Sequence, residues 1–237
     1  YEGGAFETRL SSASGALETF SNVSLLEFTF GVGSSLASQH ASSFGYEAIY
    51  VENGLVSDHD GINEYEKPFH MRCREILDAQ TYEMALNPVI SSRRVCSANF
   101  MIGHSDGEII DLETSPNNIS YHYPAEGLIT HSNHFLDARH GPSQMEKISS
   151  STLYRANRLD RLLRKNIGSL DIEKCQKALA DHFGLPNAIC RHPDKNISKA
   201  KQTMTNAAFV IDLNLRKMNV ANGPPCSNSF ISCSLEM

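Results

Sequence analysis

The chain has 237 residues, with 21 Lys and Arg against 27 Asp and Glu, a formal net charge of -6 and 41% hydrophobic residues. This composition predicts a soluble protein with one substantial core, and it excludes collagen-like and disordered low-complexity chains. A mildly acidic chain is not typical of a nucleic-acid-binding protein, which carries clustered Lys and Arg and a high pI. We therefore expect no nucleic-acid partner.

No apolar run approaches the ~20 residues needed to span a bilayer. The start, Tyr1 to Gly4, has neither a basic region nor an apolar region of a signal peptide, so we expect no membrane association. Six cysteines are spread along the chain without a Cys-x-x-Cys spacing. They predict reduced, mostly structural thiols, an intracellular protein, and no metal or redox cofactor.

The first part of the chain predicts strands over 22–30 and 45–51, followed by a helix that starts near Pro68 and a short helix over 81–86. Four strand-like runs come next, separated by turn signals, and they predict an antiparallel meander. These runs cover residues 95–102, 108–113, 119–123 and 127–131.

Two helices and three strands complete the pattern. The first helix follows serines 149–151 and has an apolar face opposite four arginines, which we expect to form a solvated basic face: Arg155, Arg158, Arg161 and Arg164. The second begins at Asp171 and stops at Gly184. Strands follow over 206–213, 218–221 and 230–235, so the element order predicts an α+β protein with helices on antiparallel sheets.

The densest polar segment is His131 to His134. On a strand, side chains alternate between faces, so His131 and Asn133 would lie on one face and Ser132 and His134 on the other. His131 and His134 could therefore not share one metal ion. An Asn amide at a strand end can donate to an oxyanion without adding a charge. Satisfied polar groups at a strand end are an equally good interpretation.

Two further candidates are less specific. Ser115 ends an apolar strand before Pro116, a position that is usually structural. Cys226 follows the rigid turn 223–225, and we expect a buried packing thiol there because no neighbouring base is evident to lower its pKa.

Several segments, in order and at plausible spacing, resemble the acyl-coenzyme A:6-aminopenicillanic acid acyltransferase family of C45 autoproteolytic peptidases. The resemblance extends over about residues 45–235. It rests on the segments 54–57, 68–70 with Arg74, 97–99, 107–116, 127–135, 181–184, 189–192, 210–212 and 223–226.

The resemblance implies an N-terminal-nucleophile hydrolase: a four-layer αββα sandwich, formed here by residues 1–237 as one domain, that cleaves its own chain before a Cys. The new N-terminal Cys attacks an amide or thioester of a small-molecule acyl or amide substrate, with acyl-coenzyme A as a candidate donor and no other cofactor. Self-cleavage would leave a heterodimer of two chains from one gene.

The resemblance also implies roles for single residues. Asn133 corresponds to the Asn that stabilises the oxyanion, and Ser115 to a Ser used in processing or acyl transfer. His131 and Thr203 are expected near the substrate, and Asn22 corresponds to a signature Asn of the family.

The nucleophile position departs from the family pattern, because Ala5 stands where a Cys is expected. Ala cannot attack a carbonyl. Three explanations stay open: a catalytically inactive relative that binds an acyl or amide ligand or a protein partner, an engineered Cys→Ala form trapped before cleavage, and a chain whose catalytic segment is missing or diverged.

Overall fold

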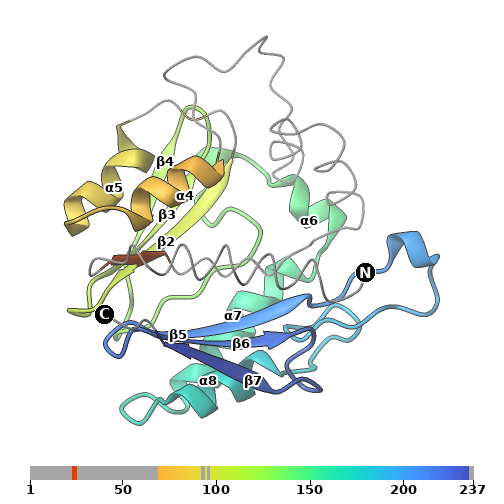
Figure 1. The fold of residues 1–237 in the computed structure, drawn as a ribbon. Helices are drawn as coiled ribbons and strands as arrows, with labels where there is room; N and C mark the ends of the chain where they lie inside the picture. Colours follow the sequence, from red (N-terminus) through yellow and green to blue (C-terminus); the bar gives the residue numbers. More distant parts are fainter. Residues whose placement is uncertain (1–22, 26–68, 92–93, 95–96, 235–237) are drawn as a thin grey trace.

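The computed structural model describes residues 23–25, 69–91, 94 and 97–234 (Figure 1). In these ranges the protein is α+β, with two small antiparallel sheets that each carry helices. The described ranges contain no helix that combines the length and the apolar character of a membrane span.

The first sheet has the order β1-β2-β3-β4, with all neighbours antiparallel. Its strands are β1 (Val23–Leu25), β2 (Ala98–His104), β3 (Ile109–Thr114) and β4 (Ile119–His122). Helices α4 (Phe69–Leu77) and α5 (Tyr82–Ile90) lie beside this sheet (Figure 1). Their buried side chains, including Ile76 and Val89, form one core with Phe100, Ile102 and Leu112.

The second sheet has the order β5-β6-β7 and is also antiparallel. Its strands are β5 (Ala207–Asp212), β6 (Lys217–Asn222) and β7 (Phe230–Ser234), and it packs with α7 (Thr152–Arg164) and α8 (Ile172–Leu179). Leu159 of α7, Leu179 of α8 and Ala221 of β6 share a second core.

The chain between β4 and α7 contains little regular structure. It holds the 3-10 helix η1 (Ala138–His140) and the short helix α6 (Gln144–Ile148), which begins with a capping box between Ser143 and Glu146. A second 3-10 helix, η2 (Lys199–Lys201), precedes β5. The sequence patterns predicted none of these three short helices, because each is shorter than the window in which helical periodicity is visible.

The two faces of the first sheet differ in chemistry. Because side chains alternate along a strand, Ile110 and Leu112 of β3 point to the α4/α5 core, whereas Asp111 and Glu113 point to the opposite face. Register sets Glu113 opposite Ser120 and Asp111 opposite His122, so these side chains share that face. The sheet therefore buries a polar face, on which the functional site is built.

Most predicted strands are confirmed. Strands β2 to β7 fall on the predicted runs, and β1 falls within the run predicted over 22–30. The prediction over 127–131 is wrong, because only an isolated bridge between Ala125 and Leu128 forms there. Glu126 and Gly127 have left-handed φ values of 53° and 76°, which close a turn instead of continuing the meander. The strand predicted over 45–51 lies outside the described residues.

Two helix ends differ from prediction. Helix α5 continues through Pro88 to Ile90, since the burial of Ala85 and Val89 compensates for the hydrogen bond that a proline removes. Helix α8 ends at Leu179, before the predicted stop at Gly184. Its end is fixed by Asp181, whose carboxylate accepts hydrogen bonds from Arg158 and from the backbone of Phe183.

The predicted solvated face of α7 is wrong at Arg155. Arg155 is only 2% exposed, whereas Leu153 of the same helix is 50% exposed. The helix is rotated so that Arg155 lies with Ala156 and Leu159 in the interior. An arginine is rarely buried unless it is paired, so the amphipathic pattern predicts an exposed side chain for Arg155.

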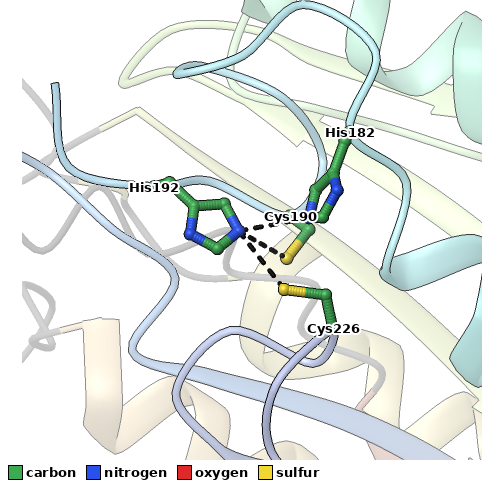
Figure 2. A group of neighbouring side chains, drawn as sticks. All are labelled: His182, Cys190, His192 and Cys226. Carbon is green, nitrogen blue, oxygen red and sulfur yellow. Dashed lines mark hydrogen bonds between the residues drawn. The ribbon is translucent and has the colours of Figure 1, made fainter.

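The expectation for Cys226 is also wrong. The thiol is exposed, and it does have a neighbouring base, since Nε2 of His192 lies 3.3 Å from its Sγ atom (Figure 2). The loop after α8 brings His192 to this turn from 34 residues away in sequence, which no local pattern indicates. Cys190 is buried.

Candidate functional site

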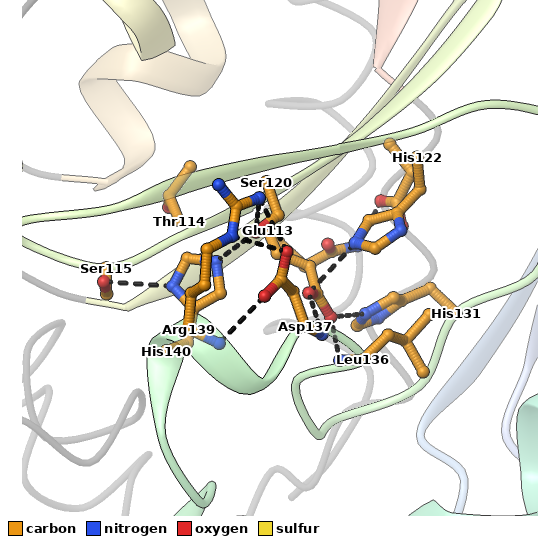
Figure 3. Close-up of polar contacts among 12 residues, drawn as sticks. Glu113, Thr114, Ser115, Ser120, His122, His131, Leu136, Asp137, Arg139 and His140 are labelled. Atoms are coloured by element: carbon orange, nitrogen blue, oxygen red, sulfur yellow. Dashed lines mark hydrogen bonds and ion pairs between the residues drawn. The ribbon is translucent and has the colours of Figure 1, made fainter.

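Glu113, on the polar face of the first sheet, organises the segment that follows β4 (Figure 3). Its side chain is 0% exposed and its carboxylate accepts four hydrogen bonds. Oε1 accepts from His131 Nε2 at 2.8 Å and from the backbone N–H of Leu136 at 2.5 Å. Oε2 accepts from His122 Nε2 and from the backbone N–H of Asp137, both at 3.0 Å. One carboxylate thus fixes the path of residues 131–137.

The charges of Glu113 and His131 stabilise each other. Burial alone would raise the pKa of Glu113, but the hydrogen bonds from His131, Leu136, Asp137 and His122 outweigh it and lower its pKa to about 2. Burial would lower the pKa of His131, yet the hydrogen bond to Glu113 and the nearby carboxylates raise it. Nδ1 of His131 also lies 2.5 Å from the Ser132 carbonyl oxygen, so both ring nitrogens donate and the ring is an imidazolium.

Asn133 lies inside the segment that Glu113 holds. Its Oδ1 accepts a 2.5 Å hydrogen bond from Nη2 of Arg155. A guanidinium can only donate, so this contact fixes which end of the amide is oxygen. The Nδ2 amino group therefore points away from Arg155, and among the described residues no acceptor occupies it.

The backbone of Asn133 is fixed as well. Its N–H donates to Oγ1 of Thr152, at the start of α7, over 2.8 Å. Ser132 donates from Oγ to the Thr152 carbonyl oxygen over 2.6 Å, and both Ser132 and Thr152 are buried. The peptide that carries the Asn133 amide is thus attached to a helix as well as to the sheet.

Two buried guanidinium groups, those of Arg155 and Arg191, lie near each other, and Arg155 contacts Asn133. Burial, and then the charge of Arg191, lowers the pKa of Arg155 to about 10. Arg191 donates to the hydroxyl groups of Ser149, Ser151 and Thr203 at 3.0 to 3.3 Å. Positive charge in a buried environment favours an anion that forms beside the Asn133 amide.

Ser115, at the end of β3, has a base beside it. Its Oγ lies 3.0 Å from Nδ1 of His140. Oγ of Ser120 accepts from Arg139 at 3.2 Å and lies 2.8 Å from Nε2 of His140, so the imidazole is held between two serine hydroxyl groups. In the tautomer with its proton on Nε2, Nδ1 of His140 accepts from Ser115.

The surroundings of the His140 ring favour its neutral form. Burial lowers its pKa, so the ring is neutral at physiological pH. The ring also stacks on Phe135, with centroids 4.5 Å apart. A neutral, fixed imidazole at hydrogen-bonding distance can accept a proton from the Ser115 hydroxyl group.

The residues predicted from sequence fall into three groups. Ser115, His131 and Asn133 belong to one connected network on the polar face of the first sheet, and His131 has both ring nitrogens engaged by protein oxygens. Thr203 joins this region through Arg191. Ala5 and Asn22 lie outside the described residues.

Sequence reasoning missed three important residues of this site. Glu113 had a signal, because acidic residues alternate with Ile110 and Leu112 along a buried strand. Arg155 was assigned to a solvated face, and His140 is 25 residues from the serine it contacts. Neither contact is visible in local sequence patterns.

The network combines the Asn133 amide, two buried guanidinium groups and a Ser–His pair. A model of the acyl-coenzyme A:6-aminopenicillanic acid acyl-transferase family matches residues 42–225, most of the chain and all of this network. A comparison with curated proteins found no match. The family match suggests acyltransferase activity, and it shows that the chain belongs to the acyl-coenzyme A:6-aminopenicillanic acid acyl-transferase family.

Proposed function

We propose that the protein is an acyltransferase or amidohydrolase that acts on an amide or thioester through a Cys acyl-enzyme, after autoproteolytic maturation. Its two sheets would stack as the middle layers of a four-layer αββα sandwich. Its substrate would be a small acyl or amide compound, with acyl-coenzyme A as a candidate donor. Family membership supports the acyl-transfer class, and the fixed Asn133 amide supports the reaction type.

The observation that carries the proposal is the hydrogen bond from Arg155 to Asn133 Oδ1. When a nucleophile attacks a carbonyl, negative charge develops on the carbonyl oxygen. A donor that is already oriented stabilises this charge without reorganisation. Asn133 Nδ2 would be that donor, and the Arg155 guanidinium polarises the amide so that its N–H is a better donor.

Ser115 and His140 supply a second element. In autoproteolysis or acyl transfer, a hydroxyl group near the cleaved bond can relay a proton. With its proton on Nε2, a neutral His140 can accept that proton at Nδ1 from Ser115. We assign Ser115 to this role.

The nucleophile is assigned to position 5, where the sequence has Ala. The test is the variant Ala5→Cys. Intact mass should show loss of residues 1–4, and the cleaved protein should release thiol from acyl-coenzyme A or amine from N-acyl compounds. A variant that neither cleaves nor turns over would remove this assignment.

The Ala at position 5 also favours a second candidate, a non-catalytic relative that binds an acyl or amide ligand or a protein partner in the same site. It predicts that the unmodified chain binds acyl-coenzyme A in calorimetry without hydrolysing it, and that Asn133→Ala weakens this binding. Turnover by the unmodified chain would contradict it.

A further inference from the structure

Two histidines and two cysteines converge at one point near the second sheet, away from the network around Glu113 (Figure 2). One ligand atom from each of His182, Cys190, His192 and Cys226 lies within 4.8 Å of all the others. The four come from two segments: the loop after α8 and the turn between β6 and β7. None of the four takes part in the site described above.

Hydrogen bonding alone does not account for this convergence. Nε2 of His192 lies 3.1 Å from Nε2 of His182, 3.3 Å from Sγ of Cys226 and 3.5 Å from Sγ of Cys190. A ring nitrogen has either one proton or one lone pair, so it makes one good hydrogen bond at a time. A cation among the four atoms would accept a lone pair from each of them.

The spacing suits a tetrahedral ion. Bonds of ~2.0–2.1 Å to nitrogen and ~2.3 Å to sulfur hold the ligand atoms of a tetrahedral Zn²⁺ site roughly 3.3 to 3.8 Å apart. The three contacts of His192 Nε2, at 3.1 to 3.5 Å, are close to this range. Two imidazoles and two thiolates are a preferred ligand set of zinc, and a tetrahedral set of two sulfurs and two nitrogens is typical of that ion.

The backbone around the four residues is well fixed. Cys190 N–H donates to the Asp181 carbonyl oxygen and His192 N–H to that of Pro186, both at 3.0 Å, which folds the loop over residues 181–192 back on itself. Arg158 of α7 holds the Asp181 side chain, directly before His182. On the other side, Asn228 donates to the Pro224 carbonyl oxygen and closes the turn that carries Cys226.

We propose that His182, Cys190, His192 and Cys226 form a zinc site that joins the loop after α8 to the β6–β7 turn. Four protein ligands leave no open position, so the ion stabilises structure and does not activate water. On binding, Zn²⁺ accepts lone pairs from two neutral imidazoles and two thiolates, and the two thiol protons pass to solvent. No oxidation or reduction takes place.

The test uses the 237-residue chain, stripped of metal with a chelator under reducing conditions and then titrated with Zn²⁺ and Co²⁺. We expect one equivalent of tightly held Zn²⁺ by elemental analysis. With Co²⁺ we expect the visible absorption of a tetrahedral site and a thiolate charge-transfer band. The cobalt spectrum is measured on the unmodified chain, so it does not depend on the folding of any variant.

Two matched variants separate this site from the other thiols. Mutation of residues that only hydrogen-bond to metal ligands typically weakens metal binding by about 10- to 100-fold. Cys226→Ser removes a ligand itself, so it should weaken Zn²⁺ binding by more than that. Cys175→Ser, on helix α8, should leave it unchanged. Far-UV circular dichroism checks that both variants fold.

Two results would overturn the proposal. One is a reduced, metal-free chain that takes up no more Zn²⁺ than Cys226→Ser and gives no tetrahedral cobalt spectrum. The other is a disulfide between Cys190 and Cys226 in protein purified without reductant, seen as two fewer titratable thiols and a cross-linked peptide in mass spectrometry.

Discussion

Arg155 donates a 2.5 Å hydrogen bond from Nη2 to Oδ1 of Asn133, and this contact turns the amide so that Nδ2 faces away from the buried guanidinium. In the proposed function, Arg155 would be a positioning residue that acts on the reaction through Asn133. Its charge is held in the interior by helix α7, whereas the amide belongs to a segment held by the first sheet.

Replacing Arg155 by Met should slow turnover of a form with Cys at position 5 without a large change in KM, because the Asn133 amide loses the donor that orients it. The decrease in kcat should approach the 100- to 1000-fold lost with an oxyanion donor. Arg161→Met, on an exposed position of the same helix, should have no effect. If Arg155 acts through Asn133, adding Asn133→Ala to Arg155→Met should slow the reaction little further. Additive losses would contradict this role.

Thr152 tests how the backbone of Asn133 is held. Thr152→Val keeps the shape but removes the hydroxyl group that accepts from the Asn133 N–H, leaving a partly buried donor unpaired. We expect a loss of about 1–3 kcal/mol in the free energy of unfolding, measured by urea denaturation. Thr152→Ser keeps the oxygen and should lose much less. Equal stability of the Val and Ser variants would show that the contact is not needed.

Glu113 should be the most sensitive position of the polar network. Glu113→Gln puts an amide N–H₂ among four donors and removes the charge that balances His131. Breaking a buried ion pair costs about 3–5 kcal/mol, so the free energy of unfolding should fall by that amount. The exposed Glu108→Gln is the control and should change it by less than about 0.5 kcal/mol. Similar behaviour of the two variants would be evidence against a central role for Glu113.

The ion pair of Glu113 and His131 also predicts that stability depends on pH. The pKa of His131 in the folded protein lies above its ordinary value of 6.5. The contribution of His131 to the free energy of unfolding is therefore complete below pH 6.5 and is lost as pH rises through the raised pKa. The pKa of Glu113 falls from 4.5 to about 2, so its contribution is complete above 4.5 and is lost as pH falls toward 2.

His131→Gln tests this effect. Burial lowers the pKa of His140, and burial followed by the charge of His131 lowers the pKa of His134, which gives the opposite pH dependence. His140 is present in both proteins compared, whereas the His131-dependent part of the His134 shift is lost in the variant and makes the measured difference smaller. The stability difference between the unmodified chain and His131→Gln should be larger at about pH 6 than at about pH 9. A difference that stays constant with pH would mean that His131 is neutral in the folded protein.

Helices and strands were predictable from the sequence where one local pattern of apolar and turn residues is enough to define the element. Alternating apolar residues with intervening turns located β2, β3 and β4, and the family segments singled out Ser115 and Asn133. The unpredicted contacts are those between distant segments, such as Arg155 with Asn133 and His192 with Cys226. Local periodicity places a residue on a face of its own element, but it does not say which other element will cover that face.

The left-handed turn at Glu126 and Gly127 shows the same limit. An apolar run after a turn predicts another strand. Instead, the left-handed φ values of Glu126 and Gly127 form a turn that ends the meander. The result matters for the site, because Asn133 is then held by side chains of β3 and α7 and not by a strand ladder.

In the proposed function, the Asn133 amide stabilises the oxyanion of acyl transfer. The most direct measurement is the rate of thiol release from acyl-coenzyme A by Ala5→Cys and by Ala5→Cys with Asn133→Ala, under identical conditions. The account predicts turnover by the first protein and a rate about 100- to 1000-fold lower for the second. Equal rates, or no turnover by the first protein, would contradict it.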